Sequence, residues 1–139
     1  GWLAVNISEW ACFTVKAAAR YIGFFLGPAA EAIAWDAVES KFRSRVIAIA
    51  EAGAPPITTL HNYNLRAFSV FSFLVQAMWI PARILKAERW AFNKILHLPS
   101  NSIVDSVGWA LDELCKVSFS SLAAMNLAAF VRVELNTVP

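Results

Sequence analysis

The side chains best suited to binding chemistry are four basic residues in a stretch that we expect to form one helix. Their spacings of three, three and five place the first three along one side, opposite the apolar positions. With the aromatic residues Trp90 and Phe92 nearby, such a strip can follow a phosphate backbone and stack a base. The alternative is an ordinary solvated face in which Glu88 supplies an internal counter-charge. The four basic residues are Arg83, Lys86, Arg89 and Lys94.

Histidine and cysteine, the residues typical of metal and nucleophilic sites, are few and scattered. His61 and His97 are 36 positions apart, and neither Cys12 nor Cys115 stands at ligand spacing from them. We therefore expect no metal and no cofactor, and we interpret the cysteines as buried free thiols. For His61 we expect a capping or surface role, and for His97 a place at a helix C-terminus, where positive charge suits the helix dipole.

The remaining polar patterns do not indicate catalysis. Asp112 and Glu113 are adjacent on an expected helix, so they point about 100° apart and cannot face each other as a carboxylate pair. Gly23 and Gly27 lack the spacing of a phosphate-binding loop, which favours a turn or a close-packing role. We expect the chain to have no enzymatic activity of its own.

The composition indicates a chain that is covered by something larger. Hydrophobic residues make up 58% and charged residues 16%, whereas typical soluble domains have roughly 45–50% and about 25%. A small domain with so few charges exposes apolar patches, for which large aromatic residues are the usual anchors. We expect Phe71, Trp79 and Trp90 to face a partner. The formal net charge of +2 is far weaker than the basic patch of an autonomous nucleic-acid binder.

These residues are placed by a mostly α-helical fold, which we expect to form one domain over residues 1–139 or to be a fragment of a longer polypeptide. Four to five helices follow a short apolar N-terminal segment, with short strands or irregular structure over residues 1–18. Residues 21–28 fit a short buried strand or a tight hydrophobic turn. Residues 29–52 fit a helix, in which Glu39 and Arg43 form an i,i+4 ion pair. The Gly and Pro residues at 53–56 end this helix.

Three further breaks divide the rest of the chain. Thr58 or Thr59 can cap a second helix that extends through residue 79. Between Arg66 and Pro81 this helix is apolar nearly all round, which favours burial. Pro81 kinks the chain or begins a helix over residues 82–98. A break at 99–102 precedes a fourth helix over 103–114, and the serines at 118–121 precede a helix over 122–135. The apolar side of the helix over 82–98 contains Ile84, Ala87, Ala91 and Ile95.

A further set of landmarks resembles the reverse transcriptases of non-LTR retrotransposons, in the stretch that follows the palm. The match spans roughly residues 15–100, and Tyr21-Ile22-Gly23 would be the Tyr-Leu-Gly turn of that family. The resemblance implies a helical thumb after this turn. The family's adjacent magnesium-binding aspartates have no counterpart, because the chain contains no Asp-Asp. The landmarks are residues 19–28, Trp35, Lys41-Phe42, Arg45, Tyr63-Asn64, Gln76, Pro81, Glu88 and Pro99.

Two hypotheses follow from these observations. The first is a non-catalytic structural or interaction subunit of a larger protein complex, with contact to membrane or lipid as one setting. The longest uncharged runs, 67–82 and 117–131, are shorter than the 18 or so residues of a spanning helix. The location implied is intracellular, with an organellar membrane complex as one example. The second hypothesis is a thumb-like segment that binds nucleic acid and lacks its palm.

Overall fold

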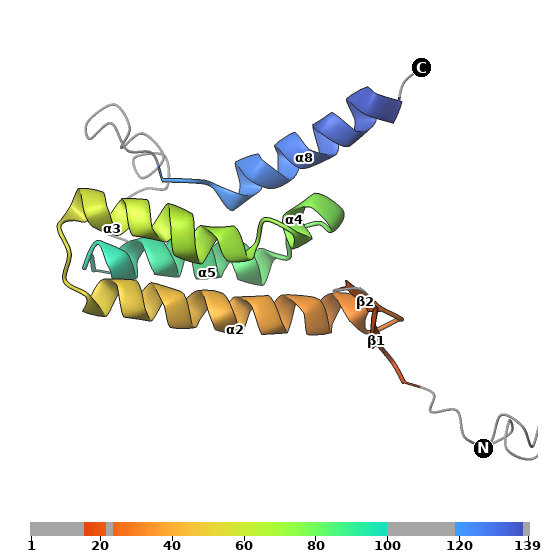
Figure 1. The fold of residues 1–139 in the computed structure, drawn as a ribbon, viewed down its shortest axis with the longest axis horizontal. Coiled ribbons are helices and arrows are strands. Elements are labelled where there is room, and N and C mark those ends of the chain that lie inside the picture. The colour runs from red at the N-terminus through yellow and green to blue at the C-terminus, as the bar shows by residue number, and fades with distance from the viewer. Residues whose placement is uncertain (1–15, 22–23, 100–118, 138–139) are drawn as a thin grey trace, which may run out of the picture. The chain divides into compact units, whose positions relative to one another are not determined.

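The fold is that of a computed structural model, which describes residues 16–21, 24–99 and 119–137. The described chain is mostly helical, as the sequence predicts, with one short two-stranded sheet (Figure 1). The chain divides into two compact units, Gly1–Ala34 and Trp35–Pro139. Cys12, Cys115, Asp112, Glu113 and the helix expected over 103–114 lie outside the described residues.

The described part of the first unit contains an antiparallel pair of strands. Strand β1 (Ala19–Tyr21) pairs with β2 (Phe24–Leu26), and Arg20 lies opposite Phe25. The expectation of a buried strand is wrong, because Tyr21 and Leu26 are both more than half exposed. Three-residue strands in a two-stranded sheet have too few neighbours to cover either face.

Gly27, which directly follows β2, has the close-packing role expected from the sequence. Its φ is +127°, and a Cβ there would lie 2.4 Å from the carbonyl oxygen of Ala17. That same oxygen accepts a hydrogen bond of 3.1 Å from the backbone N–H of Ala29. Only glycine combines this backbone conformation with so close an approach.

The long helix α2 (Ala30–Glu51) confirms the helix expected over residues 29–52. It contains no glycine or proline, and the expected pair forms, with Arg43 Nε 2.9 Å from Glu39 Oε1. The helix is followed by Gly53, whose φ is +60°, and then by Pro55 and Pro56. Its buried face includes Trp35, Phe42 and Val46, which are seven and four residues apart, or about two turns and one turn of helix.

The second helical stretch is less regular than expected. It consists of α3 (Pro56–Asn62), a π-helical turn η2 (Tyr63–Ala67), a 3₁₀ turn η3 (Phe68–Val70) and α4 (Leu74–Ala77). Neither Thr58 nor Thr59 caps it, because the helix begins at Pro56 with Pro55 at the N-cap position. The Thr59 hydroxyl instead donates to the carbonyl of Ala54 at 3.0 Å. The expectation of burial all round between Arg66 and Pro81 is also wrong, since Phe73 and Trp79 are exposed.

Helix α5 (Ala82–Ile95) follows Pro81, which occupies the N-cap position, and its four expected apolar residues are all buried. The helix ends in a Schellman arrangement, in which His97 N–H donates to Lys94 O at 3.3 Å and Leu98 N–H to Asn93 O at 2.9 Å. His97 takes the left-handed position, with φ +53°, so it lies at the helix C-terminus as expected.

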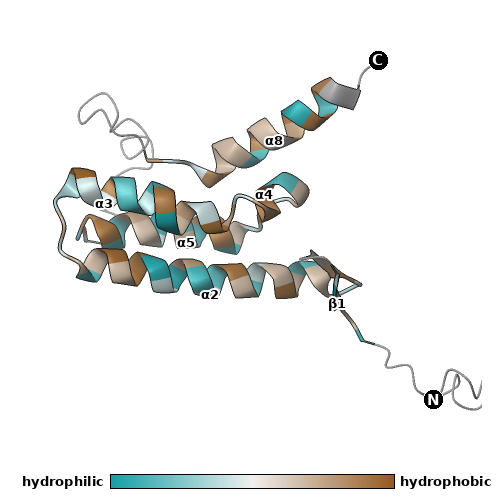
Figure 2. Cartoon of the chain, viewed as in Figure 1, coloured by the Kyte–Doolittle hydropathy of each residue, from teal (hydrophilic) through white to brown (hydrophobic). Residues whose placement is uncertain are grey.

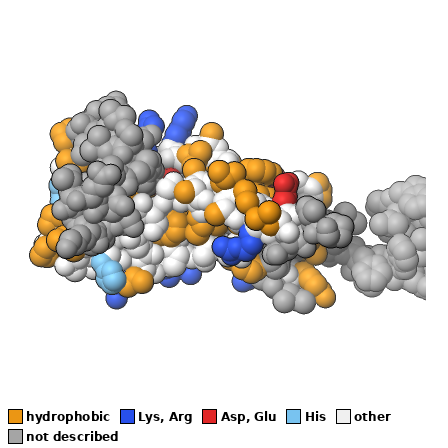
Figure 3. Space-filling view, turned by 90° about the horizontal axis from the view of Figure 1, so that it is seen from above, with side chains coloured by type: hydrophobic (Ala, Val, Ile, Leu, Met, Phe, Trp, Pro, Cys, Tyr) orange, Lys and Arg blue, Asp and Glu red, His pale blue; other side chains and the backbone are white. Residues whose placement is uncertain are grey.

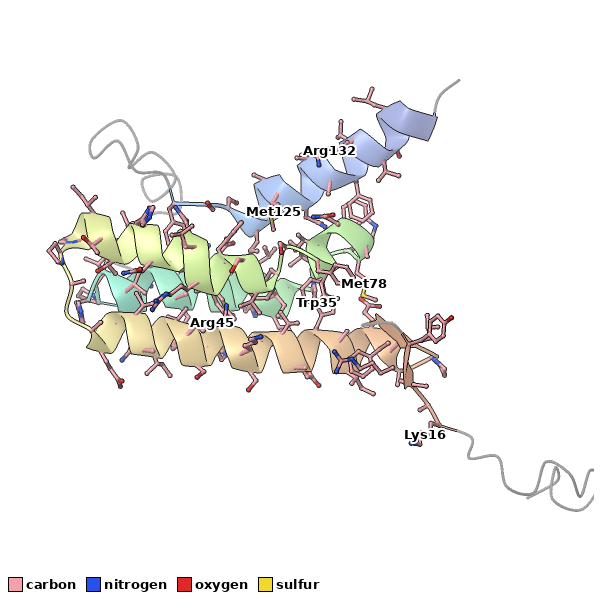
Figure 4. All side chains as sticks on the ribbon, in the orientation of Figure 1. Lys16, Trp35, Arg45, Met78, Met125 and Arg132 are labelled. Carbon is pink, nitrogen blue, oxygen red and sulfur yellow. The ribbon has the colours of Figure 1, made fainter. Side chains whose placement is uncertain are left out.

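The core of the second unit is an aromatic cluster between helices. The rings of Phe42 and Phe71 are 4.7 Å apart, and Phe119 lies 4.3 Å from Tyr63 and 4.8 Å from Phe92. In Figure 4, Trp35 extends from α2 toward this interior. Figure 1 shows α2 and α5 running in the same direction, with the α3–α4 stretch returning between them in sequence. Helix α8 (Leu122–Thr137) packs against α4 and α5.

Candidate interaction surface

Helix α8 belongs to the second unit, and several polar groups bond it to the backbone and side chains of its neighbours. Ser121 caps the helix, since its hydroxyl accepts from Ala124 N–H at 3.4 Å. The first helical N–H, that of Leu122, donates to the carboxylate of Glu88 at 2.7 Å. One helical turn later, the side-chain amide of Asn126 donates to the carbonyl oxygens of Val75 at 2.6 Å and Met78 at 3.0 Å.

These contacts define an inner face of α8, formed by Leu122, Asn126 and Ala129, all of which are buried. A second ring contact lies at the edge of that face, where Phe130 stacks on Trp79 with centroids 4.1 Å apart and planes 11° apart. The inner face therefore already has neighbours within the second unit.

The opposite side of α8 is also apolar, and it is exposed. Leu127, Val131 and Leu135 follow one another at intervals of four residues and are 60%, 47% and 73% exposed. We call these three residues the outer stripe. Brown tones colour most of α8 in Figure 2, and Figure 3, which looks onto this side, shows hydrophobic side chains gathered along the helix with few charged ones.

The three residues expected to face a partner have different positions in the structure. Trp79 is 65% exposed, with its ring against Phe130, so it lies at the surface beside α8. Trp90 is half-buried under the guanidinium of Arg43, which lies 4.9 Å from its ring centroid. Phe71 is fully buried in the aromatic core, so its assignment to a partner surface was wrong.

The four basic residues of the strip all lie on α5 and are exposed, but they do not form a purely basic surface. Arg83 donates to Asp36 Oδ1 on α2, and its Nη1 lies 3.6 Å from Glu39 Oε2. These carboxylates neutralise one end of the strip. Lys86, Arg89 and Lys94 project from the remainder of the helix.

The other residues proposed to accompany the strip occupy interior positions. Glu88 is buried and bonds to α8, so the interpretation as a solvated counter-charge was wrong. Phe92 is buried edge-on against Phe119, which makes it unavailable for base stacking. Periodicity alone could have shown this, because both residues fall on the same side of α5 as Ile84 and Ala91.

Two polar atoms in the aromatic core, Trp35 Nε1 and Tyr63 Oη, have no hydrogen-bond partner among the described residues. Burial, and secondarily the nearby Glu88 carboxylate, raises the pKa of Tyr63 well above its ordinary value of 10.0. The phenol therefore stays neutral at physiological pH, and it lies too deep to act on a substrate.

The described residues contain no group of three or more His, Cys, Asp or Glu side chains that could hold a metal ion. Within the same part of the chain, no helix has both the length and the apolar character needed to cross a membrane. His61 is exposed in the last turn of α3, and the nearest acidic residue in the sequence, Glu51, is ten positions away.

Comparisons of the chain with protein-family models, curated proteins and solved structures find no match. The resemblance to reverse transcriptases therefore remains a prediction from the sequence.

Proposed function

We propose that this chain is a non-catalytic interaction subunit, which joins a larger assembly through the outer stripe of α8. The observation that carries the proposal is the exposure of Leu127, Val131 and Leu135 on a helix whose other side is packed between Leu122 and Ala129. A helix that is apolar on two sides needs neighbours on both. Covering the outer stripe removes apolar area from water, which is worth roughly 25 cal/mol per Å².

Trp79 extends this surface beyond α8. Its indole is mostly exposed, while one ring face is held against Phe130. A large side chain fixed in this way loses little conformational freedom when it is buried by a partner, which is why tryptophan is common among the residues that dominate binding energy. The outer stripe and Trp79 together therefore supply both apolar area and an anchor.

The non-catalytic part of the proposal rests on the inventory of reactive groups. The sequence has no adjacent aspartates for a pair of magnesium ions and no close Cys–His pair. Among the described residues, the buried titratable groups are Glu88 and Tyr63, and the Glu88 carboxylate accepts a hydrogen bond from the first residue of α8.

The test measures the native mass of the tagged full chain in extracts of the cells that produce it. We expect the wild type to migrate in an assembly larger than its own 15.3 kDa, and Val131→Glu to release it as a monomer. The matched control is Ile57→Glu, which places the same charge at a 53% exposed apolar residue on α3. A monomeric wild type, or an equal effect of the two substitutions, would contradict the proposal.

A second candidate function is the thumb-like nucleic-acid-binding segment, which is favoured by the exposure of Lys86, Arg89 and Lys94 on one helix. Such contacts release condensed counterions, so affinity for a primer–template duplex would fall steeply with salt. Replacing all three with Ala should then make the plot of log affinity against log salt concentration less steep, by the amount expected for the loss of up to about three phosphate contacts. The ion pairs of Arg83 with Asp36 and Glu39 place negative charge beside the strip, and for this reason we favour the interaction subunit.

A further inference from the structure

We infer that the partner of the outer stripe is the same stripe on a second copy of this chain, so that α8 forms a symmetric helix–helix interface. This inference rests on the proposed function and names the partner of the same surface. It follows from the relief and the charge of the exposed side of α8.

The relief of this side is complementary to itself. Residues four apart form ridges along a helix surface, and Leu127, Val131 and Leu135 form one such ridge. The neighbouring row begins with Ala124 and Ala128, which are also exposed and whose methyl groups leave a shallow groove beside the ridge, and it continues with the longer side chain of Arg132. One copy therefore presents both the ridge and the groove that receives it.

Two helices that interlock through ridges of this kind cross at about −50°, with axes roughly 8–10 Å apart. A two-fold axis at the crossing point places the ridge of each copy over the alanine row of the other. The same residues are then used on both sides, which is the condition for a closed dimer. The small side chains at Ala124 and Ala128 allow the close approach.

The charge on α8 also favours a partner of the same kind. Between Leu122 and Leu135 the helix has one cation, Arg132, and one anion, Glu134, so its charge sums to zero. A strongly acidic or basic partner surface would gain nothing from this side, and would have to be desolvated against apolar residues. An equally neutral apolar ridge pays no such penalty, and every copy of the chain carries one.

The test uses the purified full chain in sedimentation equilibrium and light scattering over a wide concentration range. We expect a monomer–dimer equilibrium whose upper mass is twice 15.3 kDa. Val131→Glu, which places a charge on the ridge, should raise the dissociation constant by roughly tenfold or more. Ala128→Phe, which fills the groove on an exposed side of the helix, should do the same without adding charge.

Ile57→Glu is again the control, and it should leave the dissociation constant unchanged. Far-UV circular dichroism checks that each variant remains as helical as the wild type. If both α8 variants lost helicity, paramagnetic labels on Arg132→Cys, in a chain whose Cys12 and Cys115 are replaced by serine, would provide an independent measurement, since the dimer brings the two labels together across the crossing helices. Labels that show no mutual broadening at concentrations where the wild type is dimeric would overturn the inference.

The outcomes separate this inference from the proposed function. A purified chain that stays monomeric, but enters a larger assembly in extract in a manner sensitive to Val131→Glu, overturns the self-association and leaves the interaction subunit in place. A dimer that tolerates both α8 variants also overturns the inference, because it uses another surface. Stripe-dependent binding to neutral phosphatidylcholine vesicles by a monomer would assign the outer stripe to lipid instead. A chain that is monomeric in both settings overturns both proposals.

Discussion

Replacing Asn126 with alanine should loosen α8 more than any exposed substitution on that helix. Asn126 is buried, and its amide donates to two carbonyl oxygens, at 2.6 Å to Val75 and 3.0 Å to Met78. A typical hydrogen bond contributes about 0.5–1.5 kcal/mol net, so the loss of two should lower the free energy of unfolding by about 1–3 kcal/mol. Most of this loss comes from the two carbonyl groups, because the substitution removes the donor that Asn126 supplies to them.

The measurement is urea-induced unfolding of the full chain, followed by circular dichroism. Asn93→Ala on α5, which replaces a half-exposed asparagine, is the control and should change the free energy of unfolding by less than about 0.5 kcal/mol. Amide hydrogen exchange should also accelerate in α8 before it does in α2. If Asn126→Ala matched the control in both measurements, the view that polar contacts hold α8 in place would be wrong.

Three further predictions concern the interior and the turn after β2. Phe71→Ala should lower the free energy of unfolding by about 3–5 kcal/mol in urea, because it opens a cavity in the aromatic core; a loss below about 1 kcal/mol would show that this ring is not packed there. Tyr63→Phe should be neutral or stabilising by about 1 kcal/mol at pH 7, since it removes a buried hydroxyl without a partner. The raised pKa of Tyr63 means that its ionisation favours the unfolded chain, so wild-type stability is retained below about pH 10 and lost as the pH rises above it. Unfolding midpoints measured from pH 8 to 11 should therefore diverge in favour of the phenylalanine variant, and parallel curves would contradict this assignment. Gly27→Ala should disrupt the approach to the Ala17 carbonyl and weaken the β1–β2 pairing, which backbone amide exchange of Arg20 and Phe25 would report; unchanged exchange rates would argue against the strained turn.

Local regularity explains which parts of the fold could be predicted from the sequence. Helices α2 and α5 have apolar residues at one-turn spacing and are bounded by proline or glycine, so their extents follow from composition and periodicity alone. The start of α8 follows in the same way from the serine at 121. The outer stripe itself could also have been found, since Leu127, Val131 and Leu135 repeat every four residues on the side opposite Leu122 and Asn126.

The expectations that failed depend on contacts between distant parts of the chain. The spacing of α5 places Glu88 on the buried side, but it does not reveal the partner of its carboxylate, because the backbone N–H of Leu122 lies 34 residues away in the sequence. The sequence places Arg83 in a basic strip, whereas in the structure it pairs with Asp36 on α2, which is 47 residues away. The sequence suggests that Phe71 is a surface anchor, because no residue near it in the sequence indicates that Phe42 packs against its ring. Such pairings are set by packing between helices, which single-sequence patterns do not contain.

The π-helical turn η2 is a place where this protein can change in length. In that turn the N–H of Phe68 bonds five residues back to Tyr63, so the turn holds one residue more than an α-helix would. An α-helix bonds four residues back, so deleting one residue there would restore an ordinary helical turn and leave the residues that follow close to their present places. Phe71 and Val75 would stay in the core, and the carbonyls that receive Asn126 would stay beside α8. The same deletion in the regular helix α2 would instead rotate the adjoining helical residues by about 100°. Arg45 reaches from α2 to the Arg66 carbonyl (Figure 4), so it contacts the turn that contains the extra residue.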